Sequence, residues 1–212
     1  LETAIESFKE RGMNTAEGWA RDTASCMKLY ESMGFKLVRV FSILKRNLKT
    51  IPLDVEHNED VKLRTINNNM EDIKLLNWLD NETFKEHYNF RPHTIEETKY
   101  MIENYPDIDL NGCFFAYLKN KPVGYVSTQI DKKFLKEKGI KQGWIRTIGV
   151  LKSHRRKGIG TKLMLTAMQF LKAKGMTEVI LHVDDANPTK AIKLYKNVGF
   201  KLDKKQPSYR KD

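Results

Sequence analysis

The sequence is poor in cysteine and has no long apolar run. Cys26 and Cys113 are its 2 cysteines, and they show neither CxxC nor metal-ligand spacing, which argues against a disulfide scaffold or a metal site. We therefore expect a cytoplasmic protein without metal, with Cys113 as buried core rather than a nucleophile. No apolar run approaches the ~20 residues of a membrane-spanning helix, so no membrane partner is expected.

The charge balance is basic, although it lacks the pattern of a nucleic-acid interface. Lys and Arg number 38 against 27 Asp and Glu, which gives a net charge of +11. The cations are spread along the chain, and no basic stripe interleaved with aromatic residues appears. Nucleic-acid binding is therefore disfavoured, although a basic nucleic-acid-associated protein remains a minor alternative.

Apolar periodicity predicts an α/β protein with a mixed sheet and helices on both faces. From residue 61 onward the predicted order is β-α-α-β-β-β-α-β-α-β. The strands are expected in "VKLRTI" (61–66), "GCFFAYLKNKPVGYVSTQI" (112–130, a hairpin), "GWIRTIGV" (143–150) and "EVILHV" (178–183). The helices are expected at 67–84, at 93–105 with Thr94 and Glu97 in a capping box, at 157–174 and at 187–200.

The front of the chain resembles a later part of it. "KLYESMGFKL" (28–37) matches "KLYKNVGFKL" (193–202) almost letter for letter, and "LETAIESFKERGMN" resembles "MLTAMQFLKAKGMT" in the same order. This repeat predicts a partial unit at 1–50 (helix-strand-helix-strands), a linker at 51–60 and a complete unit at 61–212. A half unit has too little core to close itself, so we expect it to dock within the chain and to support a homodimer.

The segment "RRKGIG" (155–160) separates a predicted strand from a predicted helix. The first N–H groups of a helix have no intrahelical partner, and the helix dipole makes that end partly positive. Cations there oppose the dipole, so an anion should compensate for them. The loop therefore predicts a site for phosphate, although it matches neither the P-loop GxxxxGK[ST] nor the dinucleotide fingerprint GxGxxG.

The loop and a second block together resemble the GNAT superfamily of N-acetyltransferases. "IGVLKSHRRKGIGTKLM" carries the pattern [QR]-x-x-G-x-[GA], with Arg155, Gly158 and Gly160. "NPTKAIKLYKNVGF" carries N-x-x-A-x-x-L-Y-x-x-x-G-F, from Asn187 to Phe200. With the partial unit in front, the chain resembles the tandem GNAT proteins, a group that includes mycothiol synthase.

This resemblance implies an acyltransferase that moves an acetyl group from acetyl-CoA, as co-substrate, to a primary amine of a small molecule or peptide. Tyr195 would protonate the departing thiolate, and a phenol is protonated at neutral pH. The residues expected to hold the co-substrate are Ile148, Val150, Arg155, Arg156, Lys157, Gly158, Ile159, Gly160, Thr161 and Asn187. Since no acyl-carrying nucleophile is evident, direct attack by the amine is expected.

The base that takes the amine proton is the weakest part of the resemblance. Many relatives carry a glutamate on the strand before the loop, where this chain has Arg146 and Thr147. Glu86 and His87 in "NETFKEHYNF" are the candidates, with bulk water as a further option. The missing carboxylate also leaves open a non-catalytic acyl-CoA sensor or interaction module.

Overall fold

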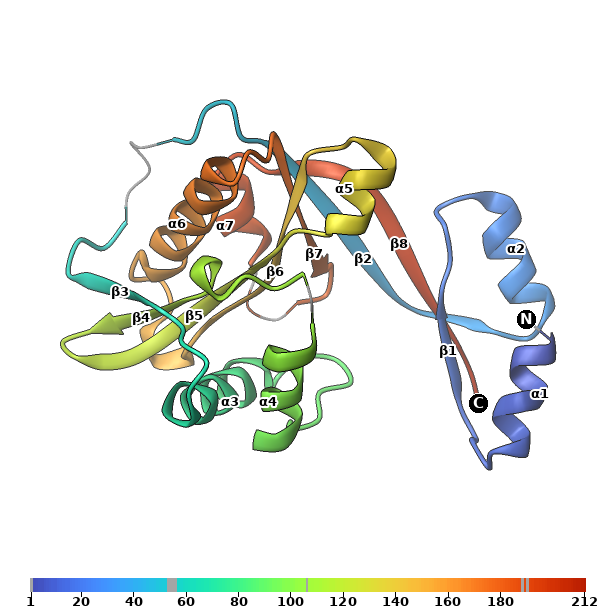
Figure 1. Cartoon of the computed structure of the whole chain (residues 1–212). Coiled ribbons are helices and arrows are strands. Elements are labelled where there is room, and N and C mark those ends of the chain that lie inside the picture. Colours follow the sequence, from blue (N-terminus) through green and yellow to red (C-terminus); the bar gives the residue numbers. More distant parts are fainter. Residues whose placement is uncertain (1, 53–56, 106, 188, 190) are drawn as a thin grey trace. The chain divides into compact units, whose positions relative to one another are not determined.

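The computed structural model describes residues 2–52, 57–105, 107–187, 189 and 191–212 (Figure 1). The chain forms two compact units that do not follow sequence order. Unit 1 comprises residues 1–44, 182–187 and 202–212, and unit 2 comprises residues 45–181 and 188–201. The predicted linker crosses 53–56, which lie outside the described residues, and the division at 51–60 remains a prediction.

Unit 2 is built on a mixed sheet with strand order β7-β6-β5-β4-β3. Antiparallel pairing joins β3 to β4, β4 to β5 and β5 to β6, whereas β6 and β7 are parallel. The strands are β3 (Val61–Thr65), β4 (Phe114–Leu118), β5 (Lys121–Gln129), β6 (Gln142–Val150) and β7 (Glu178–Asp184). The predicted α/β class with a mixed sheet is confirmed.

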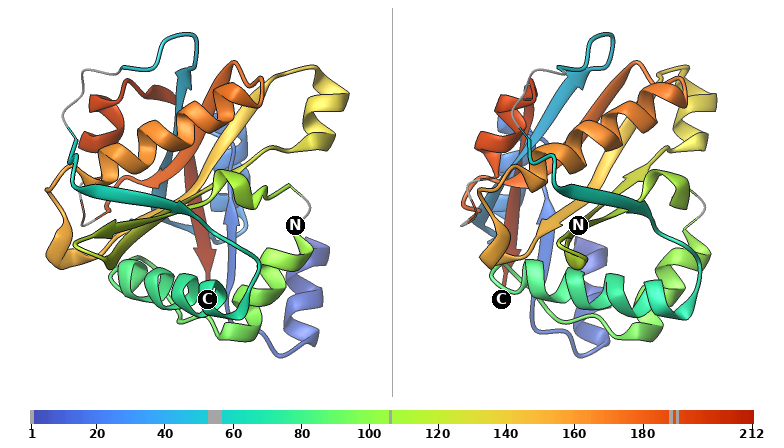
Figure 2. Two further views of the ribbon diagram at one scale, coloured as in Figure 1. Left: turned by 60° about the vertical axis from the view of Figure 1, so that its left-hand side comes forward. Right: turned by 90° about the vertical axis from the view of Figure 1, so that its left-hand side faces the viewer.

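Helices cover both faces of this sheet. In Figures 1 and 2, α6 lies on one face of β4, β5 and β6, and α3 and α4 lie on the other. The helices of unit 2 are α3 (Met70–Phe84), α4 (Ile95–Asn104), α5 (Lys132–Lys138), α6 (Ile159–Ala173) and α7 (Ile192–Asn197), with short 3-10 turns η1 (Leu110–Gly112) and η2 (Lys152–His154). A core cluster that includes Leu79, Cys113, Phe115 and Tyr125 fills the α3 side.

Local capping chemistry explains where most of these helices begin. The side chain of Asn69 accepts a hydrogen bond from the backbone of Asp72, and Thr94 forms the predicted capping box with Glu97. Helix α5 was not predicted from the sequence, although Asp131 caps its start and Gly139 closes it in the left-handed conformation. Both residues are standard helix signals.

Two predicted helices are shorter in the structure. The helix expected from 157 begins at Ile159, because Gly158 adopts the left-handed conformation with φ of 72°. The helix expected over 187–200 is α7 (Ile192–Asn197), and Ala191 is its N-cap. Asn187 therefore does not cap it, and residues 188 and 190 lie outside the described part.

Unit 1 brings the front of the chain together with its end. It contains α1 (Glu2–Glu10), β1 (Ala16–Trp19), α2 (Ala24–Ser32), most of β2 (Lys36–Asn47) and most of β8 (Lys201–Lys211). The strand order is β1-β8-β2, and β1 pairs antiparallel with β8. Ala20, Phe35 and Tyr209 form its buried cluster, against which Cys26 and Tyr30 pack. The front segment thus pairs within the chain, while the expected dimer remains a prediction.

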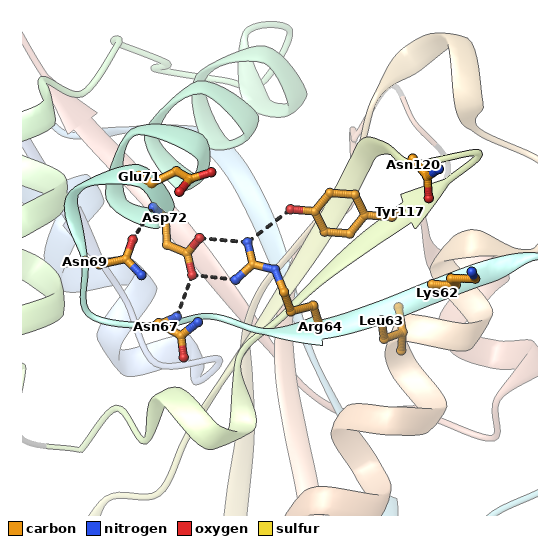
Figure 3. A pocket seen from close by; sticks show the side chains of 9 residues that line it. All are labelled: Lys62, Leu63, Arg64, Asn67, Asn69, Glu71, Asp72, Tyr117 and Asn120. Carbon is orange, nitrogen blue, oxygen red and sulfur yellow. Dashed lines mark hydrogen bonds and ion pairs between the residues drawn. The ribbon is translucent and has the colours of Figure 1, made fainter.

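A polar pocket lies where β3 leads into α3 (Figure 3). At its centre the guanidinium of Arg64 donates to both carboxylate oxygens of Asp72, each at 2.7 Å, and to the Tyr117 hydroxyl at 3.1 Å. The backbone N–H of Asn67 also donates to Asp72, at 2.8 Å. These groups satisfy one another's hydrogen-bonding capacity. Their bonds to Asp72 fix the start of α3 against β3. None of the predicted site residues lines it.

Stability should fall in acid through Asp72. Its hydrogen bonds with Arg64 hold the pKa of this carboxyl below its usual value. A lowered folded-state pKa contributes stability above the ordinary carboxyl pKa, and this contribution is lost as the pH falls through the folded value. Asp72→Asn should lower the free energy of unfolding by about 1–3 kcal/mol at pH 7. It should also reduce the fall in that free energy, measured by urea unfolding, as the pH becomes acidic. The exposed neighbour Glu71→Gln should cost about 0.5 kcal/mol; equal effects of both variants would contradict this prediction.

Candidate active site

The edge of β6 beyond Trp144 is the first element of the candidate site. Parallel pairing with β7 covers only Gln142–Trp144 opposite Glu178–Ile180. On its other side β6 stays paired with β5, where Ile148 lies opposite Val126 and Val150 opposite Gly124. Among the described residues no β-ladder continues along the β7 side of 145–150. This free edge can accept an extended chain by strand addition.

A β-bulge shapes the same stretch of β6. Ser127 lies opposite Thr147 and Thr128 opposite Ile145, which leaves Arg146 as the extra residue. Arg146 is exposed, donates to Gln129 at 3.2 Å and stacks over the Tyr105 ring at 4.8 Å. A bulge bends a strand and re-aims its groups, often beside active sites.

The loop that follows β6 is built for an anion. Arg156 has φ of 62°, a strained value for a residue with a side chain, and Gly158 adopts φ of 72°. No side chain caps the start of α6, and its first turn holds no acidic residue. By contrast, side chains cap α2, α3, α4 and α5. Arg156 and Lys157 are exposed beside these uncapped amides, which suits a phosphate.

Gly158 is required by the chain itself. A Cβ at this position would lie 2.6 Å from the Asn58 amide nitrogen and 2.9 Å from the His57 carbonyl carbon. The Lys162 ammonium donates to the carbonyls of Asn58 and Glu59, each at 3.4 Å. The segment before β3 is thus held against the start of α6. The absence of a side chain at Gly158 makes room for this segment.

Arg155 points back into the protein rather than along the loop. Its guanidinium donates to the carbonyls of Val150, at 3.0 Å, and Thr83, at 3.3 Å. It also lies 3.6 Å from the Glu86 carboxylate, which accepts from Lys152 at 2.6 Å. The Lys152 hydrogen bond lowers the pKa of Glu86, which is therefore a weaker proton acceptor. Glu86 here links the end of α3 to the loop.

The loop is also packed against the helix that carries Tyr195. A Cβ at Gly160 would lie 3.0 Å from Leu194 Cδ2, so the small residue lets α7 approach the first turn of α6. Tyr195 is buried, with its ring 6.2 Å from that of Phe200. Burial raises the pKa of Tyr195 to about 12, which keeps the phenol protonated. Ile159 is also buried, so it can offer only its backbone, while Thr161 is half-buried in the first turn.

The two remaining predicted residues are His87 and Asn187. His87 follows the end of α3, and its ring lies 4.5 Å from that of Phe84. Asn187 belongs to unit 1, where its N–H donates to the Asp184 carbonyl at 3.0 Å. Loop, β6, Tyr195, Glu86 and His87 all belong to unit 2.

A hydrogen-bonded chain that the sequence analysis missed lies on the α3 side of the sheet. The Tyr125 hydroxyl donates to Oδ1 of Asp80, and Oδ2 of the same carboxylate lies 3.2 Å from His93 Nδ1. Burial raises the pKa of Tyr125 well above its ordinary value, and Asp80 adds to this effect. No local spacing could reveal this chain, because its members come from α3, β5 and the loop before α4.

Gly149 of β6 lets α3 and Tyr125 lie directly against the strand. A Cβ there would lie 2.4 Å from Thr83 Oγ1 and 2.9 Å from Tyr125 Cε1. Thr83 and Tyr125 are both buried. The end of β6, which carries the free edge, is therefore in contact with the end of α3.

These features fit a CoA thioester. The free edge of β6 suits an extended amide-containing arm, and the uncapped cationic start of α6 suits a pyrophosphate. In the described part of the chain, no group of three or more His, Cys, Asp or Glu side chains is placed to hold a metal ion. No helix of the described residues is long and apolar enough to cross a bilayer. Cys113 is buried, and burial raises its pKa to about 11, so it is a neutral thiol.

Comparison with known proteins identifies the family. Residues 73–200 match the model of the Acetyltransferase (GNAT) family, and the chain belongs to this family. It is 33% identical over 114 residues to N-alpha-acetyltransferase 30 of Xenopus laevis, which covers 54% of this chain and 39% of that protein. It is 29% identical over 183 residues to mycothiol acetyltransferase of Thermobispora bispora, covering 86% and 61%. The chain therefore spans less than two thirds of the length of either relative.

Solved structures share the fold. A GCN5-related N-acetyltransferase from Sphaerobacter thermophilus superposes with a TM-score of 0.82 at 23% identity, covering 99% of this chain and 65% of that one. A tandem GNAT protein from the clavulanic acid biosynthesis pathway gives a TM-score of 0.71 at 14% identity, covering 99% and 67%. The resemblance to GNAT and tandem GNAT proteins is confirmed.

The contact at Gly149 can be tested by a double-mutant cycle. Gly149→Ala should destabilise the protein by about 1–3 kcal/mol, because a methyl group is forced against two buried side chains. Thr83→Ala removes the nearer obstacle, so Gly149→Ala should cost at least about 1 kcal/mol less in that background. Urea unfolding of the four proteins measures the coupling, and strictly additive effects would contradict the contact.

Proposed function

We propose that this chain transfers an acetyl group from acetyl-CoA to the amine of a small molecule or peptide, by direct attack within a ternary complex. The observation that carries the proposal is the free edge of β6, followed after the loop by an uncapped helix start with exposed cations. Family membership supports acetyl transfer in general. The names of the relatives, an N-alpha-acetyltransferase and a mycothiol acetyltransferase, favour an amine acceptor.

The residues have distinct parts in this proposal. Backbone groups of Ile148 and Val150 would pair with the extended arm, and the amides of Arg156 to Thr161 would hold the pyrophosphate. When acetyl-CoA is bound, its thioester supplies an activated acetyl group. Arg155 would support the loop from behind, because its guanidinium is bound to the carbonyls of Val150 and Thr83.

Proton transfer and positioning would complete the chemistry. Tyr195 holds a proton at neutral pH, as its raised pKa of about 12 requires, and can give it to a departing thiolate. A β6 amide near the Arg146 bulge would polarise the thioester carbonyl. The buried neutral Cys113 is unsuited to carry an acyl group, which favours direct attack over a ping-pong route. Glu86 and His87 remain candidates for the general base. The variants Glu86→Gln and His87→Gln test whether either side chain accepts the amine proton.

The loop prediction separates affinity from stability. Arg156→Gly and Lys157→Gln should each weaken CoA binding roughly 3- to 30-fold, because each removes a cation beside the phosphate. Arg156→Gly should leave stability equal or raise it by up to about 1 kcal/mol, since glycine adopts a positive φ without strain. Isothermal titration and urea unfolding measure the two quantities.

The control for the loop is Lys138→Gln, an exposed cation at the end of α5, which should leave CoA affinity unchanged. Wild-type affinity in both loop variants would remove the proposed site. CoA binding without acetyl transfer to any amine would instead favour the non-catalytic sensor.

The acid prediction concerns Tyr195. Tyr195→Phe should lower kcat by roughly 10- to 1,000-fold, in the lower part of the range for general-acid catalysis, with little change in acetyl-CoA affinity. Tyr100→Phe, which changes an exposed tyrosine on α4, is the matched control and should keep the wild-type rate. A wild-type kcat in Tyr195→Phe would show that this tyrosine only fills the core.

A further inference from the structure

His93 is held in place by hydrogen bonds from both its backbone and its side chain. Its backbone N–H donates to the Asn81 side chain at 2.8 Å. Its carbonyl accepts from the side-chain amides of Asn77 at 2.8 Å and Asn81 at 3.0 Å. Two asparagines one turn apart on α3 therefore fix the position of this residue directly before the α4 capping box.

A further hydrogen bond orients the imidazole ring of His93, in addition to those that hold its backbone. Its Nδ1 lies 3.2 Å from the Asp80 carboxylate. A carboxylate only accepts, so Nδ1 carries a hydrogen, and in the neutral imidazole Nε2 then has the lone pair. The His93 side chain is 35% exposed and that of Asp80 22%, so the imidazole remains accessible while the carboxylate behind it is more covered. This is the arrangement of a base and its orienting group.

The same carboxylate is connected to the strand that would hold the thioester. Asp80 accepts from the hydroxyl of Tyr125, which is fully buried and stays a donor. Tyr125 lies opposite Gly149 in the β5–β6 register, and its ring lies against the α-carbon of Gly149. The hydrogen-bonded chain from Tyr125 through Asp80 to His93 thus begins at a ring that packs against the free-edge stretch of β6.

Two carboxylates near the α3 side of the sheet are paired with cations, which makes His93 better suited than they are to accept a proton. Glu86 is bound by Lys152 and Arg155. On α4, Glu97 accepts from Arg91 at 2.7 Å and 3.0 Å and from the Thr94 N–H at 2.9 Å. The groups that face His93 are therefore Asp80 with Tyr125 behind it, the Asn77 and Asn81 amides, and the Arg91–Glu97 pair.

We propose that His93 is the general base of the reaction and that Asp80 is its positioning residue. The inference rests on the proposed function. Nε2 takes the proton of the acceptor amine as the N–C bond forms and the C–S bond of the thioester breaks, and the departing thiolate receives a proton from Tyr195. The proton later leaves His93 to solvent, and Tyr195 is reprotonated, so that charge and atoms balance.

The first test reads the imidazole without turnover. In the whole chain labelled with ¹⁵N-histidine, long-range NMR across a pH series should show that the neutral form of His93 is the Nδ1–H tautomer. Asp80→Asn should change the His93 signals and leave those of the other four of the 5 histidines in place. The Nε2–H tautomer, or signals indifferent to Asp80→Asn, would overturn the proposal.

The second test measures the rate of acetyl transfer to two acceptors, a hexapeptide with a free α-amine and glucosamine. His93→Gln should lower kcat/KM by about 10²- to 10⁴-fold and abolish the acidic limb of its pH profile. Asp80→Asn should lower kcat about tenfold with acceptor KM unchanged, and acetyl-CoA affinity should stay at the wild-type value in both. His87→Gln and Glu86→Gln are the comparison variants.

The outcomes separate the two proposals. A wild-type rate and pH limb in His93→Gln, or their loss in His87→Gln or Glu86→Gln alone, would overturn the base assignment and leave acetyl transfer standing. Failure of the wild-type protein to acetylate either acceptor, despite CoA binding, would count against the proposed function and against His93 with it.

Discussion

The contact between the end of β6 and the end of α3 is the constraint on which the candidate site depends. It exists because residue 149 is glycine: any side chain would meet Thr83 and Tyr125 at 2.4 and 2.9 Å. The helix can then offer the Thr83 carbonyl to Arg155, which also holds the Val150 carbonyl. The absence of a side chain at residue 149 thereby fixes the end of β6, the loop after it and the end of α3 in one arrangement.

This arrangement also divides the cations of the loop into two that pair with Glu86 and two that stay exposed. Glu86 pairs with Lys152 and Arg155, the two cations that turn toward α3. Arg156 and Lys157 stay exposed at the start of α6, where no side chain caps the amides. Positive charge beside a positive dipole end is unfavourable for an isolated protein. The cost becomes intelligible if the loop is completed by an anion, and the positive φ of Arg156 has the same explanation, since strain of this kind gathers at binding sites.

The sequence could predict what depends on neighbours along the chain. Capping residues such as Thr94, the apolar periodicity of the strands and helices, and the two glycine-containing blocks were sufficient for the fold class, most helices and the family. Contacts between distant segments were out of reach. Nothing local shows that Arg155 turns inward, that His57 and Asn58 lie against Gly158, or that Asp80 joins Tyr125 to His93. Glu86 and His87 were predicted by residue type, whereas the proposal of His93 rests on hydrogen-bond partners that only the structure shows.

The boundaries of the compact units differ from those of the sequence repeat. "KLYESMGFKL" and "KLYKNVGFKL" mark two copies in sequence, yet compactness groups the first 44 residues with 202–212. The reason is strand pairing: β1 has too few residues to stand alone, and it finds its partner in β8, the last strand of the second copy. Tyr209 of β8 completes the buried cluster with Ala20 and Phe35. A duplicated sequence therefore need not fold as two consecutive units, because an open strand edge pairs with whichever strand satisfies its backbone, and here that strand lies at the opposite end of the chain.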